Sequence, residues 1–180
     1  MSLPTLPTVQ KLQMALHAKA KEKPTLRFYS LYDKIYREDV LWSAWRRCLV
    51  NGGKPGIDGQ TFADIEKYGL KQWLTELAEE LRTKTYQPQP VRRVYILKED
   101  GKQRPLGIPT IKDRVVQTAT LLVLEPIFEA DLPKEQHAYR AGHSAHAAVE
   151  TVHQLLIKGY RNVVDADLSG YFDSIPHAEL

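Results

Sequence analysis

Residues 91–108 read VRRVYILKEDGKQRPLGI, a pattern typical of a β-hairpin. The β-branched and aromatic residues at positions 94–96 favour a strand, and Asp100-Gly101 supplies a turn. The chain can then return antiparallel over residues 104–108, with a loop at about residues 99–103. The pattern therefore predicts two short paired strands.

This hairpin lies in a strongly basic segment. Residues 82–114 contain nine Lys or Arg against three Asp or Glu, a net of +6, whereas the whole chain carries +3. Such a segment is typical of a polyanion-binding site, because each neutralised phosphate releases counterions; a solvated surface would give the same pattern. Lys98 and Arg104 flank the turn roughly opposite each other and could bind a phosphate chain from two sides. Arg92 shares the face of Lys98, but six residues of straight strand span roughly 20 Å, so all three reach one triphosphate only if the strand bends.

Helices are predicted before the hairpin. Apolar residues recur at helical spacing over residues 30–49 and again over residues 70–81. Between them lies a Gly-rich loop, residues 51–59, with four glycines in nine positions. A short amphipathic helix with basic flanks is expected within the proline-containing residues 1–25, either as an RNA contact or as a docked structural helix.

Further helices are predicted after the hairpin. One follows Pro109 and is bent or ended by Pro126. Another begins after Ser144, a favourable N-cap residue, and stops at Gly159. Residues 163–168 then read VVDADL, which predicts a strand.

The composition is that of an ordinary globular chain, with 43% hydrophobic and 26% charged residues among 180. The single cysteine, Cys48, excludes an internal disulfide and is expected to be a buried small hydrophobe in a reducing compartment. No apolar run reaches the roughly 18 residues of a membrane span, and the N-terminus lacks a signal-peptide core. The expected location is the cytoplasm, with no membrane contact.

Two carboxylates on the expected strand are candidates for metal binding. Asp165 and Asp167 are two residues apart, so on a strand they point to the same face. Mg²⁺ takes one or two carboxylates together with waters and substrate phosphates. Helix capping or plain solvation would also explain Asp-x-Asp at a strand end, and the pattern alone favours these ordinary roles.

Four motifs, taken together and in order, are similar to the reverse transcriptases of group II introns, over nearly everything from about residue 30 to the end. They are GIDG (56–59), VRRVYILKEDGKQRPLGIPT with DRVVQ (91–110 and 113–117), YRAGHS (139–144) and DLSGYFDSI (167–175). In the third motif, Ala141 and His143 stand where the family has Pro and Arg. The histidine puts a backbone contact to template or nucleotide in doubt, although it could still hydrogen-bond.

The resemblance implies an α+β fold. Its parts would be an N-terminal extension (1–25), mainly helical fingers with a basic hairpin (26–158), and the first strand of an incomplete polymerase palm (159–180). The chain stops at Leu180 inside an expected helix, which suggests a fragment. The strand of Asp167 would then lack sheet partners, so marginal stability is expected for the isolated chain.

The resemblance also assigns roles to individual residues. Asp167 matches the first catalytic, Mg²⁺-binding aspartate of the palm, and Leu168 would add its backbone carbonyl as a ligand. Phe172 matches the aromatic side chain that would collide with a ribose 2′-hydroxyl and so select a dNTP, although packing in the core is its ordinary alternative. The dNTP triphosphate would be contacted by three basic hairpin residues, Arg92, Lys98 and Arg104.

These matches predict an RNA-directed DNA polymerase, with a maturase role in the splicing and mobility of its intron. Its partners would be the intron RNA template and a DNA primer or target. The family's two later aspartates are absent, and one carboxylate cannot position two Mg²⁺ ions, so this segment is expected to be inactive alone. The alternatives are a non-catalytic RNA-binding splicing module, a degenerate remnant, or a retron-type bacterial reverse transcriptase.

Overall fold

The computed structural model describes residues 6–97, 101, 103–168, 171 and 174–176. Of the expected site residues, Lys98 and Phe172 lie outside these ranges. The chain divides into two compact units, Met1–Leu132 and Pro133–Leu180.

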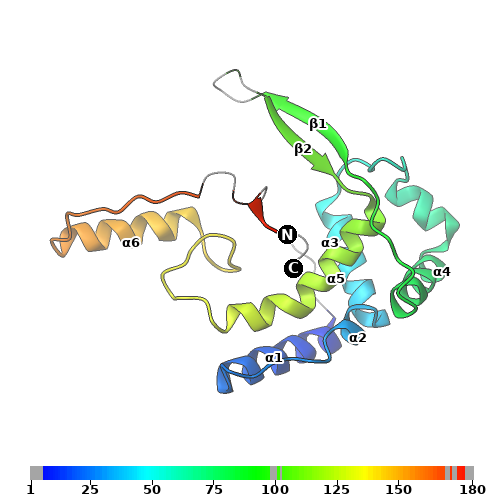
Figure 1. Ribbon diagram of the computed structural model, residues 1–180, viewed down its shortest axis with the longest axis horizontal. Helices are drawn as coiled ribbons and strands as arrows, with labels where there is room; N and C mark the ends of the chain where they lie inside the picture. Colours follow the sequence, from blue (N-terminus) through cyan, green and yellow to red (C-terminus); the bar gives the residue numbers. More distant parts are fainter. Residues whose placement is uncertain (1–5, 98–100, 102, 169–170, 172–173, 177–180) are drawn as a thin grey trace. The chain divides into compact units, whose positions relative to one another are not determined.

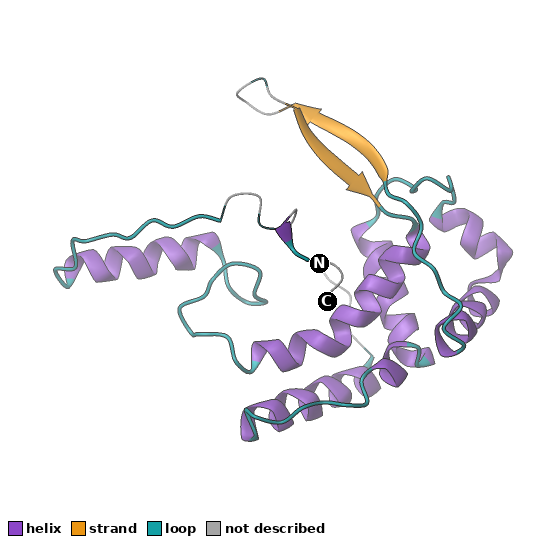
Figure 2. Cartoon of the chain, in the orientation of Figure 1, coloured by secondary structure: helices purple, strands orange, loops and turns teal. Residues whose placement is uncertain are grey.

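The elements are mainly helical (Figures 1 and 2). In the first unit they are α1 (Pro7–Glu22), α2 (Tyr32–Ile35), α3 (Glu38–Asn51), α4 (Phe62–Arg82), β1 (Arg92–Leu97), β2 (Gln103–Ile108) and α5 (Ile111–Glu129). The second unit contains α6 (Ala145–Ile157). The expected combination of helices with one antiparallel hairpin is confirmed, so the described chain has α+β content. None of these helices is both long and apolar enough to cross a membrane.

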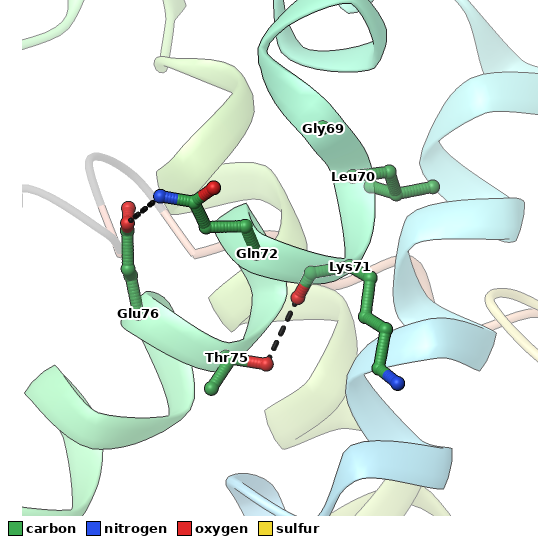
Figure 3. A pocket seen from close by; sticks show the side chains of 6 residues that line it. All are labelled: Gly69, Leu70, Lys71, Gln72, Thr75 and Glu76. Atoms are coloured by element: carbon green, nitrogen blue, oxygen red, sulfur yellow. Dashed lines mark hydrogen bonds between the residues drawn. The ribbon is translucent and has the colours of Figure 1, made fainter.

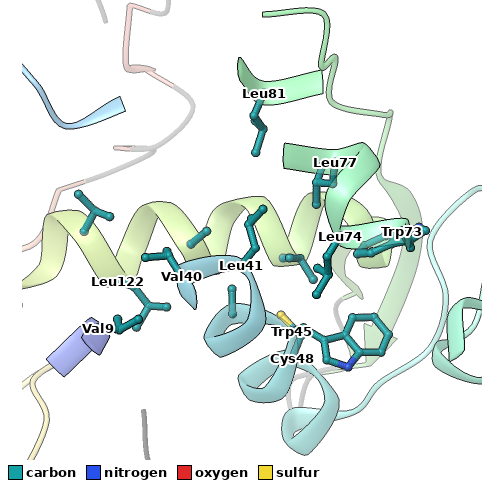
Figure 4. Packing of buried hydrophobic residues seen from close by; sticks show 14 of the residues in the cluster. Val9, Val40, Leu41, Trp45, Cys48, Trp73, Leu74, Leu77, Leu81 and Leu122 are labelled. Carbon is teal, nitrogen blue, oxygen red and sulfur yellow. The ribbon is translucent and has the colours of Figure 1, made fainter. Parts of the chain in front are cut away.

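The hydrophobic core of the first unit is built by α1, α3, α4 and α5 (Figure 4). At its centre the Trp45 ring, 1% exposed, meets Phe62 and Trp73 edge to face, with ring centroids 5.2 and 5.7 Å apart. Cys48 is buried and free, as expected, and hydrogen-bonds the Thr118 hydroxyl at 3.3 Å. Burial raises the pKa of its thiol, which keeps it a neutral core group.

The single helix predicted over residues 30–49 was wrong, because the chain forms α2 and α3 with a break between them. Arg37 is extended (φ −62°, ψ 138°) and serves as the N-cap of α3. Its guanidinium donates to both carboxylate oxygens of Asp39, at 3.0 and 2.7 Å, in the first turn of α3. Acidic residues favour the N-terminus of a helix, so Glu38 and Asp39 start a new helix here.

The helix predicted from the apolar spacing at residues 70–81 is confirmed, and it begins earlier than expected. Thr61 and Asp64 form a reciprocal capping box: the Thr61 hydroxyl accepts from Asp64 N at 3.2 Å, and Thr61 N donates to Asp64 Oδ2 at 2.9 Å. At Gly69 the backbone leaves the helical region (φ 114°, ψ 94°), which kinks α4 between two helical segments. Glycine takes this positive φ without a Cβ penalty.

Pro126 does not end α5, which continues to Glu129. A proline has no N–H, so the Leu122 carbonyl four residues earlier loses its usual helical donor. The side chain of Gln13 in α1 replaces it, with Nε2 donating to the Leu122 carbonyl at 3.0 Å. The proline is therefore accommodated by a contact between helices far apart in the sequence.

The second unit confirms the predicted start of α6. The Ser144 hydroxyl accepts from Ala147 N at 3.1 Å, and Gly159, with φ 93°, follows the last turn. The strand expected over residues 163–168 is not formed; these residues are exposed and have no regular structure. A strand is stabilised by hydrogen bonds to a neighbouring strand, and none pairs with this segment in the described part of the chain.

Candidate nucleic-acid interface

The register of the hairpin places two of the expected basic residues on one face. Arg104 lies opposite Ile96, and Arg92 lies opposite Ile108. Directly paired residues point to the same side of an antiparallel sheet, and so do residues two apart on a strand. Arg92 and Arg104 therefore share a face, with the exposed side chains of Val94 and Leu106 between them and that of Ile96 beside Arg104. Four residues of strand separate the two arginines by roughly 13 Å.

The two arginines differ in burial. Arg104 is exposed, whereas Arg92 is half-buried, and its Nε is buried without a hydrogen-bond partner among the described residues. A buried donor left unpaired is costly, and a phosphate oxygen could reach this Nε only if the Arg92 side chain moved outward. Together the two side chains can bind acceptors at both ends of an apolar strip.

The opposite face of the hairpin carries a second set that the sequence reasoning did not single out. Arg93, Tyr95 and Leu97 alternate with the first set along β1 and are all exposed. An exposed aromatic beside a guanidinium is a surface on which a nucleic-acid base can stack. The two-residue alternation of VRRVYIL could have shown this second face.

The Gly-rich loop is held by a residue whose role the sequence reasoning had not identified. Arg114, in the first turn of α5, donates from its two terminal nitrogens to the carbonyls of Gly52 and Lys54, at 3.0 and 2.9 Å. Its guanidinium carbon lies 5.5 Å from the centre of the Phe62 ring, a cation–π distance. The motif around Arg114 was noted, but a sequence pattern does not show hydrogen bonds to carbonyls some sixty residues away.

Gly56 brings the same loop directly against the start of α5. A Cβ built on Gly56 would lie 2.6 Å from the Thr110 Cα and N, and 2.9 Å from the Pro109 carbonyl carbon. Only glycine allows so close an approach of two backbones. The loop motif and the end of the hairpin are therefore in contact through their main chains.

A buried carboxylate lies where the hairpin meets α5. Asp113 is 2% exposed, and its oxygens accept from the Tyr86 hydroxyl at 2.5 Å, the Thr110 hydroxyl at 2.7 Å and Gln89 N at 3.3 Å. Burial raises the pKa of Tyr86, and its hydrogen bond to Asp113 raises it further, so the phenol stays protonated and donates. We call Tyr86, Gln89, Thr110 and Asp113 the hairpin base.

The expected metal-binding residues lie in the second unit. Asp167 and Leu168 are exposed on irregular backbone, and Leu168 N donates to Asp167 Oδ1 at 2.9 Å. No group of three or more His, Cys, Asp or Glu able to hold a metal ion occurs among the described residues. These residues therefore do not by themselves fit a two-Mg²⁺ centre.

The segment before α6 is ordered by its own side chains. Arg140 donates to the carbonyls of Pro133 and Gln136, at 2.6 and 3.3 Å. The His137 and His143 rings meet edge to face with centroids 5.3 Å apart. His143 thus packs against a second histidine.

A hollow beside the α4 kink is lined by Gly69, Leu70, Lys71, Gln72, Thr75 and Glu76 (Figure 3). Three of its polar side chains are paired within the helix: Gln72 Nε2 donates to Glu76 Oε1 at 2.9 Å, and the Thr75 hydroxyl donates to the Lys71 carbonyl at 2.9 Å.

Comparison with known proteins extends these observations. Residues 96–180 match the family described as reverse transcriptase (RNA-dependent DNA polymerase). The chain is 39% identical to Protein YkfC of Escherichia coli (strain K12) over 178 residues, 96% of this chain and 46% of that protein. It is 35% identical over 156 residues to the Group II intron-encoded protein LtrA of Lactococcus lactis subsp. cremoris, covering 85% of this chain and 25% of LtrA.

A third relative is the uncharacterized 91 kDa protein in cob intron of Schizosaccharomyces pombe, 30% identical over 174 residues, 92% of this chain and 20% of that protein. The chain thus spans between a fifth and a half of the length of these relatives. The matched segment is one of a reverse transcriptase. Residues 96–180 therefore belong to a reverse transcriptase family, and over most of its length the chain is similar to proteins encoded in group II introns, as its motifs indicated.

Proposed function

We propose that this chain supplies the nucleotide- and template-binding fingers of an RNA-directed DNA polymerase encoded in a group II intron. The observation that carries the proposal is the shared face of Arg92 and Arg104 on a hairpin whose base packs against the Gly-rich loop. Family membership supports the same reading. A second role, as a maturase that helps the intron RNA to fold and splice, is proposed on family membership alone.

In this proposal the hairpin binds phosphate. Guanidinium groups bind phosphate oxygens through two parallel hydrogen bonds, so Arg92 and Arg104 would hold the dNTP triphosphate or the template backbone. Lys98 and Phe172 are assigned by motif, as a further triphosphate contact and as the gate against the ribose 2′-hydroxyl. The partners would be intron RNA and a DNA primer or target.

We also propose that Asp167 and the Leu168 carbonyl contribute to a Mg²⁺ site that other carboxylates complete. The described residues do not form that site, so DNA synthesis is not expected from the 180-residue chain alone.

A second candidate function is RNA binding without chemistry. It is favoured by one feature: the basic hairpin and its base lie wholly in the first unit and make no use of Asp167. A splicing module would need the basic surface and not the carboxylate.

The test is RNA binding over a salt series, with a structured group II intron RNA and an unrelated RNA duplex. Arg92→Ala and Arg104→Ala should each make the negative slope of log K against log salt shallower by about 1, because each removes roughly one phosphate contact. Arg82→Ala is the matched control, since Arg82 is exposed and already paired with Glu79 at 2.6 Å. Equal slopes for all three variants would contradict the proposed surface.

Primer extension with Mg²⁺ and dNTPs separates the two candidates. The chain alone should make no DNA. If the same chain, extended by the remaining segments of a longer relative, makes DNA and loses this activity on Asp167→Asn, the polymerase is supported. If the extended protein binds intron RNA and makes no DNA, RNA binding without chemistry is the better account.

A further inference from the structure

We propose that Asp113 is a positioning residue that fixes both ends of the β1–β2 hairpin, and so directs Arg92 and Arg104 relative to the Gly-rich loop. The inference rests on the proposed function, because it concerns how the same basic hairpin is aimed at its ligand. It adds a buried residue that does not itself contact a nucleotide.

The entry to the hairpin is held by two donors. Gln89 N, three residues before β1 begins at Arg92, donates to Asp113 Oδ2 at 3.3 Å. The Tyr86 hydroxyl donates to Asp113 Oδ1 at 2.5 Å. Both contacts join the segment between α4 and β1 to the first turn of α5.

The exit from the hairpin is held by the same carboxylate. Thr110, two residues after β2 ends at Ile108, is fully buried and donates from its hydroxyl to Asp113 Oδ2 at 2.7 Å. Asp113 N returns a hydrogen bond to the Thr110 hydroxyl at 3.1 Å. One side chain thus binds the chain on both sides of the hairpin.

The Gly-rich loop is joined to the same turn of α5. Arg114, the next residue, binds the carbonyls of Gly52 and Lys54, and Gly56 touches the Thr110 backbone. Asp113 and Arg114 therefore join the basic hairpin and the Gly-rich loop to the same turn of α5. Binding side chains act only where supporting contacts hold them in place, so this frame would fix where Arg92 and Arg104 lie.

Helix capping alone does not explain Asp113. Asp64 occupies the same position in α4, three residues after its N-cap Thr61, yet it is exposed and its bonds are all to Thr61. Asp113 is buried, and its bonds to Tyr86 and Gln89 reach 27 and 24 residues away. Burying a carboxylate is costly unless donors satisfy it, so a role limited to capping would be met better by an exposed residue.

The first test is hydrogen–deuterium exchange on the 180-residue chain carrying Asp113→Asn. The amide NH₂ of asparagine is a donor, so it would face at least one of the donors that Asp113 now accepts from. The amides of β1 and β2 should exchange about tenfold faster, while those of α3 change little. Asp64→Asn is the matched control and should leave the hairpin amides unchanged.

Tyr86→Phe is a milder variant, since it removes one donor on the entry side and keeps the ring. It should speed exchange in the hairpin less than Asp113→Asn does, and again spare α3. If neither variant changes hairpin exchange, or if both speed the hairpin and α3 equally, the positioning role is overturned.

The second test links the residue to binding. If Asp113 directs the hairpin, Arg104→Ala should weaken RNA binding less in the Asp113→Asn background than in the unaltered chain. In the Asp64→Asn background, Arg104→Ala should weaken RNA binding as much as it does in the unaltered chain. Equal losses in all three backgrounds count against positioning. Absence of RNA binding by the unaltered chain would overturn the proposed function, and the exchange result would then decide the positioning role by itself.

Discussion

Adding one methyl group at Gly56 should separate the Gly-rich loop from α5. In Gly56→Ala the new Cβ would lie 2.6 Å from both the Cα and N of Thr110 and 2.9 Å from the Pro109 carbonyl carbon. Carbon atoms in favourable contact are about 3.5–4.0 Å apart, so the overlap is roughly 1 Å. All three obstructing atoms are backbone, and no side-chain rotation relieves it.

Overpacking of this kind costs about 1–3 kcal/mol, and a rigid backbone on both sides favours the upper end. The free energy of unfolding from urea titration measures it directly. RNA affinity should fall in the same variant, because the loop can escape the overlap only by leaving the start of α5.

Gly59→Ala is the control in the same loop. Gly59 has φ +68° and no atom within 4 Å of an added Cβ, so its cost is only the left-handed backbone, about 1–2 kcal/mol. If Gly56→Ala is no more destabilising than Gly59→Ala and leaves RNA affinity intact, the contact between loop and helix does not exist as described.

Three further predictions concern stability. Gln13→Ala should cost about 1–3 kcal/mol by leaving the Leu122 carbonyl unpaired, and much less in a Pro126→Ala background, where the helix regains its own N–H; urea titration of the four proteins tests this. The hydrogen bond from Thr61 holds the pKa of Asp64 below its usual range, so the stability that the capping box provides is present above the unfolded carboxyl pKa and is lost as pH falls through the lower folded value. The Tm difference between Thr61→Ala and the unaltered chain should therefore be largest near pH 7 and shrink in acid; a difference independent of pH would refute this. Finally, α6 has no buried residue whereas α3 has six, so α6 amides should exchange far faster than α3 amides, and equal protection would contradict the assignment of the core to the first unit.

Local signals in the sequence predicted what depends on local chemistry. The turn at Asp100-Gly101 and the β-branched residues before it gave the hairpin, and Ser144 gave the start of α6. The helix over residues 30–49 failed because its apolar spacing continues smoothly through Arg37, where an arginine–aspartate contact starts a new helix. Apolar periodicity shows which face of a helix is buried, but it does not show where one helix ends and the next begins.

The candidate site was only partly accessible from sequence. Arg92 and Arg104 could be placed on the hairpin because strand alternation is regular. The role of Asp113 could not, since Tyr86 and Gln89 reach it only after α4 and α5 have packed. The strand expected at residues 163–168 failed for a related reason: its pattern predicts a strand only where a neighbouring strand pairs with it.

The position of the hairpin base has a consequence for how this protein can vary. Among the described residues, the hydrogen bonds that join the hairpin to α5 lie at its root, at Gln89 before β1 and Thr110 after β2. A single residue inserted between Thr110 and Arg114 would therefore disturb the hairpin and the Gly-rich loop together, because the same turn of α5 binds both of them. Changes of chain length are expected to be tolerated least at this turn.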